Sequence, residues 1–199
     1  MVFRKGKLGE FALIDQLARI VPSSPKVIKG IGDDAAVLSL RGNGYELLTT
    51  DMLVEGVHFR KGTDPRLIGR KALACNVSDI AAMGGVPTHA VVSIAVPKSC
   101  STDFVENVYY GIGQLAREFD ISIVGGDTVA SGKFLINIAL MGQVPRKFLT
   151  LRSGAKFQDW IWVTGALGRA WKTTRHLTFT PRVRESQFLV RNFKPSAMM

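Results

Sequence analysis

The sequence has few cysteines and no long apolar run. Its 199 residues include only Cys75 and Cys100, which do not form a C-x-x-C pair. Neither a disulfide framework nor a structural zinc site is therefore indicated, and reduced, buried thiols are expected. No apolar stretch approaches the roughly 20 residues that a bilayer span needs, and the N-terminus MVFRKGKLGEF lacks the apolar stretch of a signal peptide. We therefore expect a cytoplasmic protein that does not enter a membrane.

Several familiar catalytic and nucleotide-binding signatures are also missing. The sequence contains no G-x-x-x-x-G-K-[ST] P-loop and no G-x-S-x-G elbow. The glycines at 30 and 32 are only a weak match to the dinucleotide fingerprint, because a strand is expected after them where a helix is required. The three histidines are too scattered for a zinc site. His58 alone stays a candidate among them, since it follows Asp51 by seven residues in a glycine-containing loop.

Positive charge is abundant but unevenly placed. The formal net charge is +10, yet residues 1–120 are nearly balanced, while residues 121–199 hold 12 basic and only 3 acidic side chains. The excess therefore marks a basic tail and not a basic domain. An Arg-rich tail with interspersed aromatic residues is also compatible with nucleic-acid binding, which is the least favoured of the three interpretations considered for the chain.

Hydrophobic periodicity and stop signals predict alternating strands and helices. We expect helices over residues 9–21, 65–83 and 102–119, and strands over residues 35–40, 45–50, 88–96, 121–126, 134–144 and 160–165. Glycines and an asparagine at 42–44 predict a hairpin between the first two strands, with Asp51 where the second one ends. This order favours an α+β fold over a doubly wound parallel sheet.

Carboxylates recur beside glycines or other small residues at four places: GIGDD (30–34), TTDMLVEGVHF (49–59), NVSDIAAMGG (76–85) and GGDT (125–128). Glycine allows a backbone to approach a phosphate closely, and aspartate oxygens are ligands that Mg²⁺ prefers. Together they suggest a magnesium-nucleotide site. Taken singly, Asp33 and Asp127 could be ordinary turn residues and Asp51 a strand terminus.

Asp79 is the most informative carboxylate because it is expected in mid-helix, a poor place for an unpaired aspartate. On a period of 3.6 residues, Asn76 and Asp79 point together from a stripe of small residues. A polar pair that satisfies a neighbouring helix end is the structural alternative.

These motifs carry a resemblance to a known family. The segments GEFALI, GIGDDAAVL, TTDMLVEGVHF, GRKALACNVSDIAAMGGVP, VGGDT and LRSGAK occur in the order seen in the thiamine-monophosphate kinases. That family belongs to a superfamily that includes aminoimidazole ribonucleotide synthetase and selenophosphate synthetase. The resemblance covers roughly residues 9–165, and several motifs in order are far more specific than one.

The resemblance implies a ferredoxin-like N-terminal domain that forms a homodimer, its sheet joining the partner's in a shared barrel. It implies that residues 1–150 form the ATP- and Mg-binding domain, and that residues 151–199 are a shortened basic remnant of the connection to a second domain. The family's C-terminal domain opens with a D-x-S-D-G-L motif that this sequence lacks, so we expect that domain to be missing.

The activity implied by the resemblance is ATP-dependent phosphorylation of thiamine monophosphate to thiamine diphosphate, assisted by several Mg²⁺ ions. His58 would contact thiamine monophosphate. The metal ligands would be Asp34, Thr49, Thr50, Asp51, Asp79 and Asp127. The ATP contacts would be Tyr109, Gly126, Asp127 and Arg152. An attacking phosphate is already ionised near neutral pH, so no acid or base catalyst is assigned. A catalytically inactive nucleotide-binding or dimerisation remnant is the second interpretation.

Overall fold

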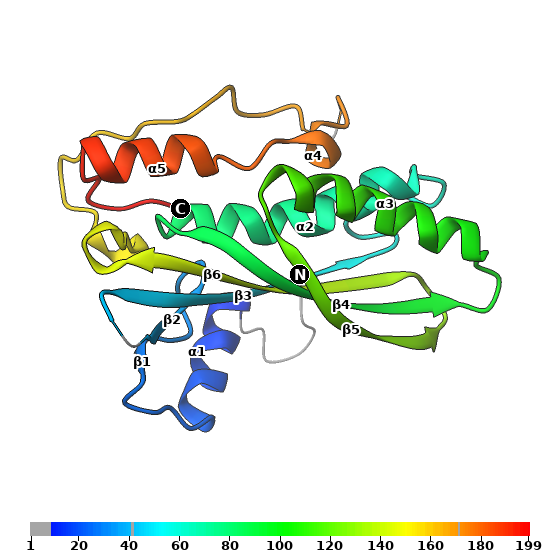
Figure 1. Cartoon of the computed structure of the whole chain (residues 1–199), viewed down its shortest axis with the longest axis horizontal. Helices are drawn as coiled ribbons and strands as arrows, with labels where there is room; N and C mark the ends of the chain where they lie inside the picture. The colour runs from blue at the N-terminus through cyan, green and yellow to red at the C-terminus, as the bar shows by residue number, and fades with distance from the viewer. Residues whose placement is uncertain (1–8, 41, 171) are drawn as a thin grey trace.

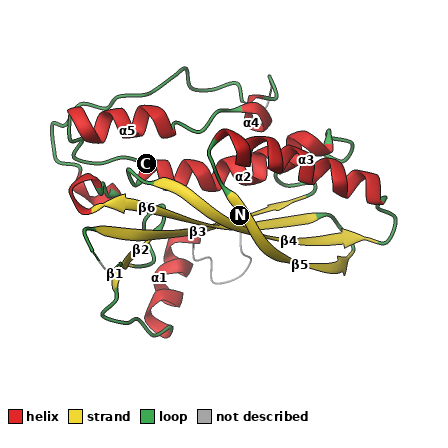
Figure 2. Cartoon of the chain, in the orientation of Figure 1, coloured by secondary structure: helices red, strands yellow, loops and turns green. Residues whose placement is uncertain are grey.

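The computed structural model describes residues 9–199 with the exception of positions 41 and 171. A mixed sheet forms one layer, and two long helices cover one of its faces (Figures 1 and 2). The strands are β1 (Val27–Lys29), β2 (Ala36–Ser39), β3 (Gly44–Val54), β4 (Val86–Pro97), β5 (Ser122–Ser131) and β6 (Leu135–Pro145). They lie in the order β1-β2-β3-β6-β4-β5, and among these pairs only β4 and β5 are parallel.

The helices are α1 (Glu10–Ile20), α2 (Pro65–Ala82), α3 (Thr102–Glu118), α4 (Arg175–Thr178) and α5 (Val183–Asn192). Both long helices begin at residues suited to cap them. The Asp64 carboxylate accepts a hydrogen bond from the Arg66 amide, with Pro65 in the first turn, and the Ser101 hydroxyl accepts one from the Phe104 amide. No helix in the described part of the chain is long and apolar enough to cross a membrane.

The core lies between the sheet and helices α2 and α3. Side chains of β6 alternate, so Ile136, Ile138 and Leu140 are fully buried while their neighbours are only half-buried. From the other side α2 supplies Leu73 and Val77, also fully buried. The opposite face of the sheet, called here the open face, carries partly exposed side chains. Each strand residue is therefore assigned to the covered or the open face by its register.

The C-terminal helices α4 and α5 pack over α2 and form a third layer (Figure 1). The Ser186 hydroxyl donates to the Ala81 carbonyl, and the Gln187 amide donates to the Gly84 carbonyl at 2.8 Å. Gly84 has a φ of 73° and ends α2, as the Gly-Gly pair in the sequence predicts. The division of the chain at residue 150 stays a prediction, but the segment beyond it is anchored on α2.

The α+β class and the main helices are confirmed, with differences at several strands. The element order from β3 onward is β-α-β-α-β-β, where a strict ferredoxin-like unit runs β-α-β-β-α-β. Asp51 does not end its strand, because β3 continues to Val54 along the whole of β6. The strand predicted at 160–165 is wrong: these residues have no regular structure, and Trp160 and Ile161 are 88% and 94% exposed. Strand β1 and helix α5 were not predicted.

Candidate active site

The site lies where one face of α2 crosses the covered face of β3. Lys71, Cys75 and Asp79 are spaced four residues apart on α2 and therefore line one side of the helix. Thr49 and Asp51 of β3 pair in register with Leu140 and Ile138, whose side chains are buried in the core. Thr49 and Asp51 consequently point from the sheet toward α2, as do the buried leucine and isoleucine.

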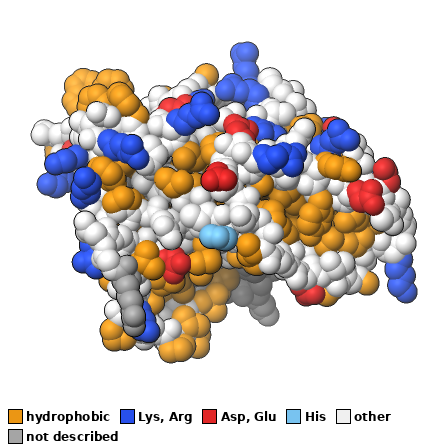
Figure 3. All heavy atoms as spheres, in the orientation of Figure 1, with side chains coloured by type: hydrophobic (Ala, Val, Ile, Leu, Met, Phe, Trp, Pro, Cys, Tyr) orange, Lys and Arg blue, Asp and Glu red, His pale blue; other side chains and the backbone are white. Residues whose placement is uncertain are grey.

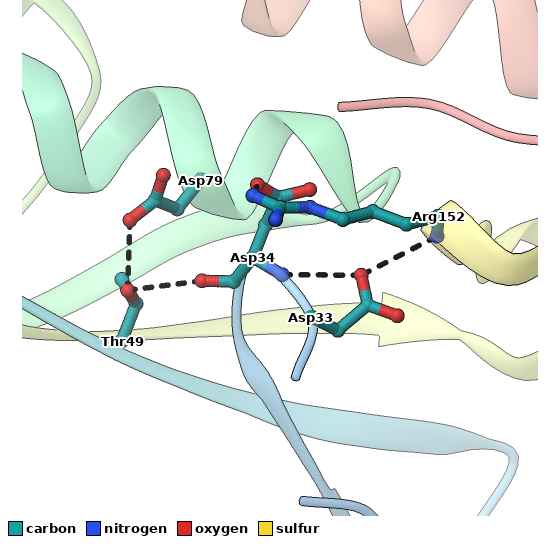
Figure 4. A network of polar contacts seen from close by, with 5 residues as sticks. All are labelled: Asp33, Asp34, Thr49, Asp79 and Arg152. Atoms are coloured by element: carbon teal, nitrogen blue, oxygen red, sulfur yellow. Dashed lines mark hydrogen bonds and ion pairs between the residues drawn. The ribbon is translucent and has the colours of Figure 1, made fainter. Parts of the chain in front are cut away.

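Thr49 joins two of the predicted carboxylates (Figure 4). Its hydroxyl contacts the Asp79 carboxylate, with 2.8 Å between Oγ1 and Oδ2, and the Asp34 carbonyl oxygen at 3.2 Å. Asp34 comes from the loop before β2, and Asp79 from the last turns of α2. A buried hydroxyl thus holds together two segments that are far apart in sequence.

Arg152 closes one end of this cluster. It lies in the short 3-10 helix η2 (Arg152–Gly154), and its guanidinium forms an ion pair with the Asp34 carboxylate. Its backbone amide donates to Asp33 Oδ1 at 3.4 Å. The hydrogen bond and charge of Asp34 raise the pKa of Arg152 above its already high value. The side chain is 41% exposed, so its remaining donors can reach a ligand.

Burial disfavours the charged form of the carboxylates in the cluster. Desolvation raises the pKa of Asp79 to about 7, with further upward contributions from Asp51 and Asp34 and an opposing one from the Thr49 hydrogen bond. Desolvation likewise raises the pKa of Asp51, against the charge of His58. It also raises the pKa of the Cys75 thiol to about 11, with Asp51 and Asp79 adding to the shift. A bound cation would relieve this accumulation of negative charge.

Two buried carboxylate oxygens in the cluster, Asp33 Oδ2 and Asp34 Oδ2, have no hydrogen-bond partner among the described residues. The Asn76 Oδ1 atom, one turn before Asp79, is also buried and has no hydrogen-bond partner among the described residues. Within the described residues no three His, Cys, Asp or Glu side chains are grouped tightly enough to enclose a metal ion unaided. Mg²⁺ normally uses one or two carboxylates together with water and substrate phosphates, so the residues present fit such a shared site.

His58 lies at the other end of the α2 face, in the turn after β3. Its Nδ1 accepts a hydrogen bond from the Val54 amide at 3.0 Å, and its carbonyl oxygen accepts one from Lys71 Nζ at 2.7 Å. The side chain is half-buried. His58 and Arg152 therefore mark opposite ends of one acidic cluster.

The other predicted site residues lie elsewhere in the same chain. Thr50 points to the open face, where its hydroxyl contacts Asn137 Oδ1. Asp127 pairs in register with Ser93, and through it with the row of Asn137, so it also lies on the open face. Three strand spacings of about 4.8 Å put β5 roughly 14 Å from β3 across the sheet. Gly126 packs against the backbone of Val92.

Tyr109 is on α3, beside a shallow groove of about 430 Å³ between α3, β4 and β5. Figure 3 shows hydrophobic side chains gathered at the surface over β4, β5 and α3. Burial raises the pKa of the Tyr109 hydroxyl. The structure thus brings Asp34, Thr49, Asp51, Asp79, Arg152 and His58 to one side of the sheet, and leaves Thr50, Tyr109, Gly126 and Asp127 outside that group.

Sequence reasoning missed Lys71 and Cys75 and assigned no contact to Asp33. The spacing of 71, 75 and 79 was a usable signal, because residues four positions apart on a helix share a face. The contact between Asp33 and the Arg152 amide joins residues far apart in sequence, and local pattern does not predict it.

Comparison with known proteins gives consistent results. Residues 32–144 match the model of the family "AIR synthase related protein, N-terminal domain". The chain is 38% identical over 163 residues to thiamine-monophosphate kinase of Bacillus subtilis (strain 168), covering 81% of this chain and 50% of that protein. It is 38% identical over 165 residues to that of Aquifex aeolicus (strain VF5), covering 83% and 51%. The chain thus spans about half the length of the curated relatives it matches.

Among solved structures, the fold is similar to AaThiL complexed with AMPPCP and TMP. The TM-score is 0.79 at 30% identity, and the match covers 96% of this chain and 65% of that one. The family match over residues 32–144 includes both long helices and the acidic residues of the cluster, while Arg152 lies beyond it.

Proposed function

The chain belongs to the family of AIR synthase related proteins through their N-terminal domain, and from this premise we propose that it phosphorylates thiamine monophosphate with ATP. The product would be thiamine diphosphate, as in thiamine diphosphate biosynthesis. Support comes from relatives called thiamine-monophosphate kinase and from the similar structure that holds AMPPCP and TMP. Transfer would be direct: a phosphate oxygen of thiamine monophosphate attacks the γ-phosphorus, and the bond to ADP breaks.

One observation carries the proposal: an acidic cluster with buried oxygens that lack partners among the described residues lies between an arginine at one end and a histidine at the other. Phosphoryl transfer needs positioned anions and stabilised charge more than acid or base catalysis. Arg152 offers a planar fork of donors to nucleotide phosphates. His58 offers a ring N–H to the second substrate. Two recognition groups on either side of a cation site suit the joining of two phosphates.

We propose Mg²⁺ as the cation because oxygen donors dominate the cluster. Each ion would be held on the covered side of the sheet by one or two of the carboxylates of Asp34, Asp51 and Asp79 and by the Thr49 hydroxyl, with water and substrate phosphates completing its coordination. When bound, Mg²⁺ neutralises phosphate charge and stabilises the charge that develops on the transferred group. The Thr49 hydroxyl keeps Asp34 and Asp79 in place, and the Arg152–Asp34 ion pair orients the guanidinium toward the same point.

We propose that the protein is a homodimer whose open sheet faces meet. The open face carries apolar side chains that a monomer would leave in water: Leu48, Met52 and Val91 are 42%, 52% and 40% exposed. Thr50 and Asp127 lie on that same face. Light scattering should therefore give about twice the 21.7 kDa mass of the chain, whereas the mass of one chain would contradict this arrangement. A cytoplasmic location is also proposed, since Cys75 and Cys100 are free thiols.

Calorimetric titration tests the proposed ligands without requiring turnover. With Mg²⁺ present, the protein should bind both AMPPCP and thiamine monophosphate. Arg152→Ala should weaken nucleotide binding and His58→Ala should weaken thiamine monophosphate binding, each by about tenfold or more for a lost hydrogen bond to a charged group. Arg117→Ala, at an exposed position on α3, serves as the control for the arginine substitution. Failure of the wild-type protein to bind either ligand would exclude the proposal.

A further inference from the structure

Lys71 is a buried lysine that the proposed reaction has not yet used. It lies in the middle of α2 and is only 9% exposed. Its ammonium group donates to the His58 carbonyl oxygen at 2.7 Å, and Nζ lies 3.2 Å from His176 Nδ1 in α4. Burial lowers the pKa of Lys71. A lysine is seldom buried without a specific partner, so these contacts require an explanation beyond packing.

The turn that carries His58 combines hydrogen bonds of its own backbone with contacts to Phe134 at its two ends: the Glu55 amide donates to the Phe134 carbonyl at 3.0 Å, and the Phe59 ring packs on the Phe134 ring. The Gly56 amide donates to the Phe59 carbonyl at 2.8 Å, and the His58 amide donates to the Val54 carbonyl at 2.9 Å. The carbonyl oxygen of His58 points the other way, toward α2, where Lys71 reaches it. Lys71 therefore connects the turn that carries His58 to helix α2, which also carries Asp79.

The His58 ring is oriented in the same small network. Because the Val54 amide donates to Nδ1, that nitrogen presents its lone pair, and in the neutral ring the proton is on Nε2. The ring can then donate through Nε2. Rotation of the peptide at His58 would break both the Val54 hydrogen bond and the alignment of this donor.

We propose that Lys71 is a positioning residue: by holding the His58 carbonyl it fixes the turn so that His58 Nε2–H points at an acceptor atom of the monophosphate substrate. The role rests on the function proposed above. It specifies recognition of that substrate only and leaves nucleotide binding, which depends on Arg152 at the far end of the cluster, unaffected.

The contact with His176 extends this support to the C-terminal layer. A lysine amino group donates and does not accept when charged, so His176 Nδ1 acts as the acceptor. Burial, followed by the charges of Lys71 and Arg60, lowers the pKa of His176, in keeping with a neutral acceptor ring. Helix α4 thus gives the lysine a second contact through His176, and His176→Ala should reproduce a fraction of the Lys71 effect.

The test compares Lys71→Met, which keeps the length and apolar stem, with Lys71→Arg, which keeps the donors, and with Lys26→Met at an exposed position. Calorimetry measures the affinity for thiamine monophosphate and, separately, for AMPPCP with Mg²⁺. Nitrogen and carbon chemical shifts of the His58 ring report its tautomer in each full-length protein. Thermal unfolding checks that every variant is folded.

Lys71→Met should weaken thiamine monophosphate binding by about tenfold, as expected for a lost charged hydrogen bond. AMPPCP binding should stay within about twofold, a change too small to reflect a lost contact. Lys71→Arg should restore much of the affinity, and Lys26→Met should change nothing. The His58 ring should carry its proton on Nε2 in the wild-type protein and lose that uniform state in Lys71→Met.

An unchanged affinity and tautomer in Lys71→Met would overturn the positioning role, and so would equal losses for both ligands, which indicate general damage to the fold. If Lys71→Met does not fold, the wild-type protein still gives a test. A His58 ring that carries its proton on Nδ1 there would overturn the positioning role. Failure of the wild-type protein to bind thiamine monophosphate would instead contradict the proposed function, and the His58 tautomer and its dependence on Lys71 would still decide the positioning role.

Discussion

Asp79→Asn is expected to remove the proposed ATP-dependent phosphorylation of thiamine monophosphate while leaving the fold intact. The substitution keeps an acceptor for the Thr49 hydroxyl but removes the charge that would face Mg²⁺ and the phosphates. Loss of one preorganised electrostatic group costs on the order of 100-fold or more in turnover. Asp51→Asn should also lower turnover, since the Asp51 carboxylate belongs to the same acidic cluster and its charge raises the pKa of Asp79.

The same substitution should make the protein more stable at alkaline pH. The pKa of Asp79 is raised to about 7 in the folded protein, compared with 3.8 for the ordinary group. The carboxyl therefore contributes full stability below about pH 4, and this contribution is lost as the pH rises through about 7. Since the asparagine side chain stays neutral at every pH, Asp79→Asn should exceed the wild-type free energy of unfolding by about 1 to 3 kcal/mol at pH 8, and by little at pH 4.

Urea unfolding at the two pH values, together with product analysis, measures both effects. Asp120→Asn, an exposed aspartate in the turn after α3, is the matched control and should change neither quantity. Near-normal turnover in both Asp51→Asn and Asp79→Asn would contradict the assignment of the acidic cluster. A lower stability of Asp79→Asn at pH 8 would show that the carboxylate is compensated in the free protein.

Gly111→Ala should strongly destabilise the fold, because α2 and α3 cross in direct backbone contact at that position. A Cβ at Gly111 would overlap the Arg66 carbonyl, and one at Gly69 would overlap the Val108 carbonyl. The helices would have to separate, and overpacking of this kind costs about 1 to 3 kcal/mol. Helix α3 packs on α2, which carries Asp79, so separation of the two helices would also disturb the site.

Gly113, on the same helix, is a matched control. A Cβ there would meet only the end of the Arg117 side chain, at 3.5 Å. Gly113→Ala should therefore stabilise the protein by about 1 kcal/mol through helix propensity alone. Urea unfolding midpoints of the two variants should move in opposite directions. Equal shifts for the two variants would mean that the helix contact does not limit the residue at 111.

The sequence predicted helices α1, α2 and α3 well because their signals are local. Capping residues before α2 and α3 and the Gly-Gly pair after α2 lie beside the elements they delimit. The length of β3 was underestimated because Asp51 was interpreted as the end of the strand, although the apolar residues Met52, Leu53 and Val54 follow it. Only pairing with β6, far along the chain, extends the strand past Asp51 to Val54.

The tail shows the opposite error. The segment at 160–165 has the composition of a strand, yet no strand in the described part of the chain pairs with it, and Trp162 is 86% exposed. Helix α5 was missed because its charged residues obscure a buried stripe of Val183, Ser186 and Val190 that packs on α2. Tertiary contacts decided both outcomes.

For the site, sequence identified the acidic residues but not their grouping. Spacing placed Asp79 on a helix and Asp51 on a strand, and the register of β3 then determined that Asp51 faces α2 while Thr50 faces away. A shift of one residue would have exchanged them. The contact between Asp34 and Arg152 joins residues 118 positions apart, a separation that no local pattern specifies.

The most direct test of the proposed function is incubation of the purified protein with ATP, Mg²⁺ and thiamine monophosphate, followed by chromatographic measurement of both products. The acidic cluster and its two recognition groups predict thiamine diphosphate and ADP in equal amounts, dependent on Mg²⁺ and absent in Asp79→Asn. ADP without thiamine diphosphate would contradict the proposed kinase activity and indicate ATP hydrolysis instead. No product from a protein that binds both ligands would contradict it as well and favour the inactive nucleotide-binding remnant.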